Sequence, residues 1–131
     1  MTAKYKRVMI IDDNELDIYI TNKLVTNNYL AEQVLEYTSA EEALEYLIGN
    51  RDQPENLPNL IFLDIYMPRM DGFEFIDRIN ELDDVIKSHC TICVVSSTVS
   101  HYDIHKVKIE KGIPLFTSKP ITKDFIASLI E

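Results

Sequence analysis

The stretch FLDIYMPRMDG, residues 62–72, decides the fold prediction, because an apolar run ends there in an aspartate and a turn. The run NLIFLD (59–64) is apolar on both faces, which is typical of a central strand in a parallel sheet. Pro68 and Gly72 then mark a turn before the next helix. A buried strand does not end on a charged residue without a reason, so Asp64 is the first candidate functional residue.

Strand-like and helix-like segments alternate on either side of this stretch. Runs rich in apolar and β-branched residues predict four further strands, at residues 5–12, 31–37, 90–97 and 113–119. Apolar residues at helical spacing predict five helices, at residues 14–28, 39–49, 72–82, 100–111 and 121–130. The strict alternation predicts an α/β domain with a parallel sheet and helices on both faces. In the first helix, the apolar residues at helical spacing are Leu16, Tyr19, Ile20 and Leu24.

Length and charge limit the classes of function. The 131 residues suit a single domain over positions 1–131, and no output domain is expected. With 22 acidic and 13 basic residues, the net charge of −9 disfavours binding to nucleic acid or to an anionic membrane surface. No apolar run is long enough to span a bilayer and no leader pattern is visible, so we expect a cytoplasmic protein.

Cys90 and Cys93 have the C-x-x-C spacing of redox and metal sites. They fall on the predicted strand 90–97, where residues three apart point to opposite faces and lie roughly 10 Å apart. A disulfide needs Cα atoms within about 7 Å, and no second C-x-x-C completes a zinc site. We therefore expect both cysteines to pack in the core.

Polar residues follow four of the predicted strands, and the carboxyl ends of parallel strands share one edge of the sheet. The residues that should converge there are Asp12, Asp13, Asp64, Ser96, Ser97, Lys119 and Pro120. Close carboxylates repel, and Mg²⁺ suits an all-oxygen cluster. With the metal bound, an ionised carboxylate can act as a nucleophile toward a phosphoryl group. Each residue alone has a plain alternative; Asp13 or Asn14, for example, could simply cap the first helix.

Four motifs together resemble the receiver domain of bacterial two-component response regulators. They are IIDD (10–13), FLDIYMPRMDG (62–72), VVSS (94–97) and TSKP (117–120), in the family's order and spacing over essentially the whole chain. The resemblance implies a flavodoxin-like fold with five strands in the order 2-1-3-4-5 and five helices. It also implies that a sensor histidine kinase or a histidine phosphotransfer protein phosphorylates one aspartate.

Matched position by position, the resemblance implies a role for each site residue. Asp64 is the phospho-acceptor, Asp13 is a direct ligand of Mg²⁺, and Asp12 acts through water or as a support. The backbone carbonyl of Tyr66 also binds the metal. Ser96, with Ser97 beside it, and Lys119 bind the phosphoryl group. The turn residues are Met67, Pro68, Gly72 and Pro120, and the Lys119–Pro120 bond is expected to be cis.

The resemblance also implies a switch. Phosphorylation would turn Phe116 inward and change the face formed by the helix at 100–111, the strand at 113–119 and the last helix, where a downstream protein binds. Phe116 is equally well explained as a core aromatic. Tyr66 and Thr98 flank the site and should tune the lifetime of the phosphoryl group. A monomer or a weak homodimer is expected.

Two other readings compete with a phosphorylatable stand-alone receiver. A phosphatase of the haloacid dehalogenase type also forms an aspartyl phosphate. That family has Asp or Thr two residues after the nucleophile, however, where this chain has Tyr66. A pseudo-receiver would be expected to lack an acid, the lysine or the hydroxyl, and all of these are present here.

Overall fold

The computed structural model describes residues 2–82, 84–97 and 100–131. A five-stranded sheet with the order β2-β1-β3-β4-β5 forms the centre of the domain, and every neighbouring pair of strands is parallel. The strands are β1 (Tyr5–Ile11), β2 (Ala31–Tyr37), β3 (Leu60–Asp64), β4 (Thr91–Ser96) and β5 (Leu115–Ser118). The flavodoxin-like fold and the predicted strand order are confirmed.

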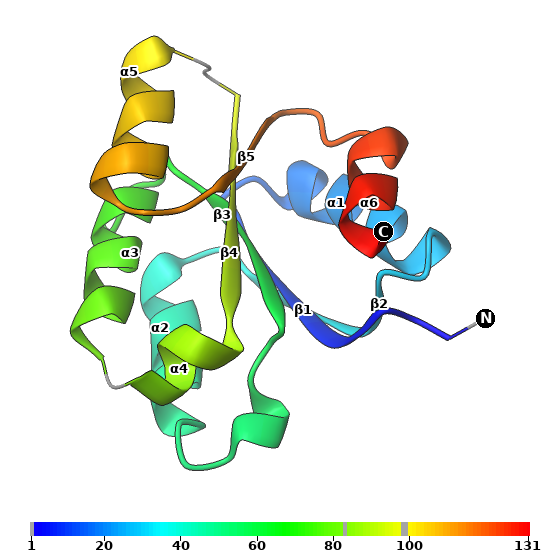
Figure 1. Ribbon diagram of the computed structural model, residues 1–131, viewed down its shortest axis with the longest axis horizontal. Helices are drawn as coiled ribbons and strands as arrows, with labels where there is room; N and C mark the ends of the chain where they lie inside the picture. The colour runs from blue at the N-terminus through cyan, green and yellow to red at the C-terminus, as the bar shows by residue number, and fades with distance from the viewer. Residues whose placement is uncertain (1, 83, 98–99) are drawn as a thin grey trace.

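The helices cover both faces of this sheet (Figure 1), with α1 and α6 on one side and α2, α3, α4 and α5 on the other. The α-helices are α1 (Glu15–Asn27), α2 (Ala40–Gly49), α3 (Gly72–Glu81), α4 (Asp84–His89), α5 (His101–His105) and α6 (Lys123–Ile130). A 3₁₀ turn, η1 (Pro54–Asn56), precedes β3, and a π-helical segment, η2 (Lys106–Glu110), continues α5. No helix in the described part of the chain is long and apolar enough to cross a membrane.

The prediction of five helices is wrong, because a sixth, α4, lies between α3 and β4. The backbone at Leu82 is extended and ends α3, and α4 then places Ile86 in the core with no exposed surface. A helix of six residues with one buried side chain has too few turns to produce a periodic apolar pattern.

Helix α1 is present as predicted, but most of the apolar residues whose spacing predicts it are not the residues that it buries. Leu16 and Tyr19 are 66% and 58% exposed, whereas Ile18, Thr21 and Val25 are the buried residues of the helix. The buried face of α1 contains a polar residue, Thr21, so a search for apolar residues at helical spacing finds the neighbouring face of the helix instead. The start of the helix, in contrast, follows its cap, since the Asn14 side chain accepts a hydrogen bond from the backbone N–H of Asp17 at 3.0 Å.

Both faces of the sheet are packed, which leaves only strand ends and loops for chemistry. One apolar cluster lies under α2, α3 and α4, and the other under α1 and α6. Cys90 belongs to the first cluster and Cys93 to the second, and both are free thiols. Burial raises the pKa of each thiol to about 12. The prediction that they are core residues is confirmed.

Candidate functional site

Three acidic side chains meet where β1 and β3 end. Asp12 and Asp13 follow the last residue of β1, and Asp64 is the last residue of β3, its neighbour in the sheet. Ligand oxygens of the three carboxylates all lie within 4.8 Å of one another. Asp12 and Asp64 are buried and Asp13 is exposed, so the cluster opens to solvent on one side. Within the described residues, this is the one cluster of three or more potential metal-ligating side chains.

Lys119 brings a positive charge to this cluster from the end of β5. Its Nζ lies 2.7 Å from Asp12 Oδ2 and 3.4 Å from Asp64 Oδ2. The backbone N–H of Lys119 donates to the carbonyl of Ser96 at 2.9 Å, which joins the ends of β4 and β5. Burial alone would lower the pKa of Lys119, but the hydrogen bonds to its carboxylate partners and their charges raise it, so the side chain stays protonated.

A fourth carboxylate, Asp17 on α1, was not predicted from the sequence. Its Oδ2 lies 2.9 Å from Lys119 Nζ. Asp17 stands one helical turn beyond Asp13, so helical spacing does place it toward the same edge of the sheet. An acid in the first turn of a helix is common without any contact, however, and the lysine is 102 residues away in the sequence.

The Asp64 carboxyl group has a higher pKa than an ordinary aspartate. Burial raises its pKa to about 6, the charge of Asp12 adds to this, and Lys119 acts in the opposite direction. Repulsion between two buried carboxylates is relieved by a divalent cation as well as by a proton. An all-oxygen donor set that is open on one side fits Mg²⁺, which keeps several water ligands.

Substitution of Asp64 by Asn should therefore stabilise the metal-free protein above pH 6. The pKa is about 6 in the fold against 3.8 for an ordinary Asp, so ionisation costs folding free energy that is absent below pH 3.8 and complete above pH 6. We expect the free energy of unfolding to rise by about 2 kcal/mol at pH 8, and by much less at pH 4. Urea unfolding of both proteins in EDTA measures this difference. An equal gain at both pH values would show that the charge is not its cause.

The loop after Asp64 is folded tightly against the strand end. The backbone N–H of Gly72 donates to the carbonyl of Ile65 at 2.6 Å, and a Cβ added to Gly72 would lie 2.7 Å from the Asp64 carbonyl oxygen. Met67 is buried and Pro68 exposed within this loop. The close approach explains why a glycine begins α3, because any side chain at this position would clash with the backbone at the end of β3.

Tyr66 connects this loop to α5 through its side chain. Its hydroxyl donates to Asp103 Oδ1 at 2.7 Å, and its ring packs edge-on against Phe73 with centroids 6.5 Å apart. The hydrogen bond to Asp103 raises the pKa of Tyr66 to about 12, so the hydroxyl keeps its proton. Asp103 is only 2% exposed, and no pattern in the sequence indicates this contact.

The structure places the other predicted residues as follows. Ser96 is fully buried at the end of β4, and Ser97, which follows it, is exposed. Phe116 is half-buried on β5 against the cluster under α2, α3 and α4. The Lys119–Pro120 bond is cis, as predicted. Thr98 lies outside the described residues.

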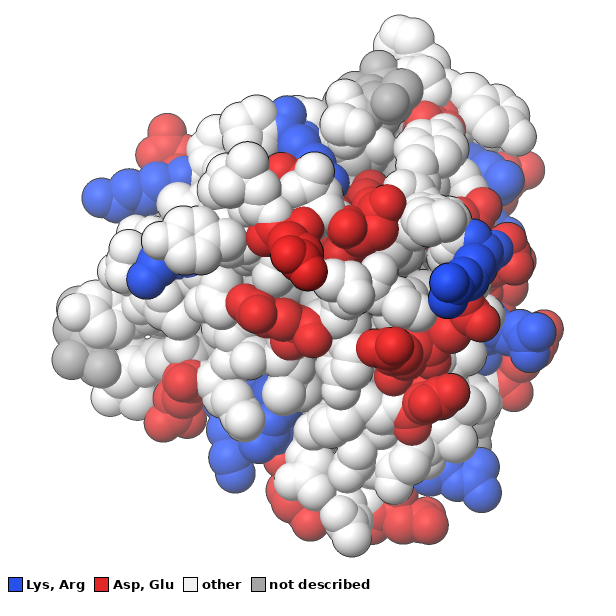
Figure 2. Space-filling view, turned by 180° about the vertical axis from the view of Figure 1, so that it is seen from behind, with Lys and Arg blue, Asp and Glu red and all other residues white. Residues whose placement is uncertain are grey.

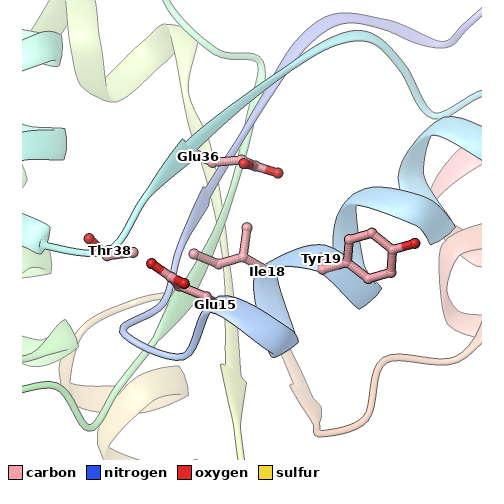
Figure 3. A pocket seen from close by; sticks show the side chains of 5 residues that line it. All are labelled: Glu15, Ile18, Tyr19, Glu36 and Thr38. Atoms are coloured by element: carbon pink, nitrogen blue, oxygen red, sulfur yellow. The ribbon is translucent and has the colours of Figure 1, made fainter.

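A hollow in the surface leads to the acidic cluster. It measures about 480 Å³ and is lined by Asp13, Glu15, Thr38, Ser39, Glu42, Pro68 and Arg69. Glu15 and Thr38 also line a groove between α1 and β2, together with Ile18, Tyr19 and Glu36 (Figure 3), so the two hollows adjoin. Asp13, the exposed acid of the cluster, is therefore accessible from this side.

The comparisons with known proteins agree with this geometry. The family model of the response regulator receiver domain matches residues 8–131. A two-component response regulator from Cytophaga hutchinsonii has a solved structure with a TM-score of 0.87 and 25% identity, covering 96% of this chain and 94% of that one. The Arabidopsis thaliana receiver domain of histidine kinase CKI1, solved with Mg²⁺, gives a TM-score of 0.74 and 26% identity, covering 96% and 92%.

The chain thus belongs to the response regulator receiver domain family, whose members are phosphorylated on aspartate in two-component signalling. A curated relative, the 3′,5′-cyclic-nucleotide phosphodiesterase regA of Dictyostelium discoideum, is 28% identical over 125 residues, which are 95% of this chain. The chain spans only 15% of that relative's length. The family accepts phosphoryl groups for signalling and is not a classical enzyme family.

Proposed function

We propose that this chain is a stand-alone receiver, a single domain over residues 1–131, that accepts a phosphoryl group on Asp64. The observation that supports this most strongly is the contact of Lys119 with both Asp12 and Asp64, at 2.7 and 3.4 Å, where three strands of one sheet end. Each of these residues is common at a strand end or a helix cap. Their meeting within one buried site is what phosphoryl transfer needs.

In the proposed reaction, an oxygen of the Asp64 carboxylate attacks the phosphorus of the donor. The new O–P bond forms as the bond from phosphorus to the leaving nitrogen of a phosphohistidine breaks, and that nitrogen keeps the electron pair. The Lys119 ammonium stabilises negative charge on the transferring oxygens, and the Ser96 hydroxyl donates to one of them. Both groups lie at the carboxyl edge of the sheet, Ser96 at the end of β4 and Lys119 directly after β5.

Asp12, Asp13, Asp64 and the backbone carbonyl of Tyr66 are the proposed ligands of Mg²⁺. The three carboxylates supply an all-oxygen set within 4.8 Å, and the related CKI1 receiver was solved with Mg²⁺. The bound metal would neutralise phosphoryl oxygens and keep the acceptor ionised at neutral pH. In this chain, Asp12 is oriented for that role by the backbone N–H of Asn14, which donates to its Oδ1 at 2.9 Å.

The proposed partners are a sensor histidine kinase or histidine phosphotransfer protein that supplies the phosphoryl group, and a protein target that reads it. The proposed output face consists of α5, β5 and α6 and includes Phe116. Acidic side chains gather over the middle of one face (Figure 2), in keeping with the net charge of −9, so neither nucleic acid nor an anionic membrane is a proposed partner. We propose that the protein acts as a monomer or weak homodimer.

The proposed place of action is the cytoplasm. The two cysteines are free thiols, as expected in a reducing compartment.

Tyr66 is proposed to lengthen the lifetime of the phosphoryl group. Tyr66 lies two residues after Asp64, and its ring is fixed by Phe73 and Asp103. We propose that this bulky side chain hinders the attack of water on the phosphoryl group. We expect Tyr66→Asn to hydrolyse its phosphoryl group about threefold to tenfold faster, a change in barrier of about 1 kcal/mol. Decay of the adduct after removal of the donor measures this. Tyr66→Phe keeps the ring and is the matched control, and an unchanged half-life in Tyr66→Asn would contradict the proposal.

A phosphatase of the haloacid dehalogenase type is less well supported. It needs an acid or a threonine two residues after the nucleophile to handle the leaving group, whereas this chain has Tyr66 there, whose hydroxyl donates a hydrogen bond to Asp103.

Phosphoramidate tests the proposed function, because its P–N bond has the chemistry of phosphohistidine. The full chain is incubated with phosphoramidate and MgCl₂ and its intact mass is recorded. We expect the mass of one phosphoryl group to be added and then lost slowly after the donor is removed. A chain that binds Mg²⁺ and yet gains no mass would contradict the proposal and favour a constitutive binding module.

A further inference from the structure

The lysine of the site has no hydrogen-bonding capacity to spare. A protonated lysine has three N–H donors. Lys119 Nζ contacts three carboxylates, Asp12 Oδ2 at 2.7 Å, Asp17 Oδ2 at 2.9 Å and Asp64 Oδ2 at 3.4 Å. A phosphoryl oxygen on Asp64 can take over the N–H that now points to Asp64 Oδ2. Lys119 can bind a second phosphoryl oxygen only when Asp12 or Asp17 gives up its contact.

The three contacts are not equally easy to break. The Asp12 carboxylate is held by a second hydrogen bond, because its Oδ1 accepts from the backbone N–H of Asn14. The Asp12 side chain is also buried, at 8% exposed. The Asp17 side chain is 34% exposed. A carboxylate that already borders solvent is rehydrated on release, whereas a buried one loses its charge partner without compensation.

Asp17 lies closer to the ammonium group than the Asp64 carboxylate does. The distance from Lys119 Nζ is 2.9 Å to Asp17 Oδ2 and 3.4 Å to Asp64 Oδ2. The negative charge of Asp17 thus competes with the acceptor for the group that must stabilise the transferring phosphoryl oxygens.

We propose that Asp17 is a positioning residue that restrains Lys119 in the unphosphorylated protein and releases it when Asp64 is phosphorylated. This inference rests on the proposed function. It assigns to α1 a direct part in the reaction, since the carboxylate that must move belongs to that helix. Asp17 slows phosphorylation by stabilising the lysine in its resting position.

The matched variants for the test are Asp17→Asn and Asp124→Asn. Both remove one negative charge from the first turn of a helix and keep the size of the side chain, but Asp17 contacts Lys119, whereas Asp124 is an exposed residue of α6. A third variant, Asp17→Glu, keeps the charge. Phosphorylation by phosphoramidate with MgCl₂ is followed by intact mass at fixed ionic strength, beside the unmodified chain.

We expect Asp17→Asn to be phosphorylated about threefold to fivefold faster than the unmodified chain, the effect of losing a partly exposed ion pair. Asp124→Asn should match the unmodified chain, and Asp17→Glu should return most of the way to it. Equal rates for Asp17→Asn and Asp124→Asn would overturn the inference and leave the proposed function intact, as would slower phosphorylation of Asp17→Asn. No phosphorylation of the unmodified chain would overturn both.

Discussion

Asp64→Asn is expected to gain no phosphoryl group from phosphoramidate under conditions in which the unmodified chain is fully modified. The carboxamide has no anionic oxygen to attack phosphorus, and its other neighbours stay in place because the shape of the side chain is unchanged. The loss should be complete, since among the acidic residues that the structure describes Asp64 alone ends the central strand β3, where it is buried and contacts Lys119.

Asp71→Asn is the matched control for this experiment. Asp71 is the N-cap of α3 and lies in the same loop, where its side chain accepts from the backbone N–H of Glu74 at 2.9 Å. Asparagine caps a helix about as well as aspartate, so this variant should fold and be phosphorylated normally. Modification of Asp64→Asn at the normal rate would mean that the acceptor has been assigned wrongly.

Gly72→Ala should be the most destabilising single-methyl addition in the acceptor loop. The added Cβ would lie 2.7 Å from both the Asp64 carbonyl oxygen and Ile65 Cα, and both are backbone atoms of the acceptor strand and its loop. Relief of the clash must move the strand end that positions Asp64, which costs about 3 kcal/mol in the free energy of unfolding. Urea unfolding in EDTA measures this loss.

Gly49→Ala is the control for replacing a glycine by alanine at a position where the added methyl group causes no clash. Gly49 is the last residue of α2, it is exposed, and a Cβ there would have nothing within 4 Å. Alanine should stabilise the protein by about 0.5 kcal/mol because it restricts the unfolded chain. Similar stabilities for Gly72→Ala and Gly49→Ala would show that the loop is looser than the close contact at Gly72 implies.

Features that depend on strand ends were predictable from the sequence. Once the chain is read as alternating strands and helices, parallel pairing places the ends of β1, β3 and β5 at one edge, whatever the details of packing. Asp12, Asp13, Asp64 and Lys119 therefore meet as expected. The cis bond at Lys119–Pro120 was expected from the family resemblance alone.

Features that depend on which side chain turns toward which neighbour were not predictable in this way. The buried face of α1 includes Thr21, so apolar spacing pointed to its exposed neighbours. The partners Asp17 and Asp103 are ordinary helix-start acids in the sequence, and only the tertiary structure brings them to Lys119 and Tyr66. The helix α4 is too short to leave a periodic signal.

The central claim is that Asp64 accepts a phosphoryl group and that this depends on a metal ion. The most direct test treats the unmodified chain with phosphoramidate, in MgCl₂ or in EDTA, and records its intact mass. Peptide mapping then locates the phosphoryl group. We expect the acidic cluster around Asp64 to need a cation before its carboxylate can react with an anionic donor, because close carboxylates repel each other and the donor. We predict one phosphoryl group, located on the peptide that contains Asp64, in MgCl₂ and almost none in EDTA. Equal modification in both, or a phosphoryl group on another residue, would contradict the account.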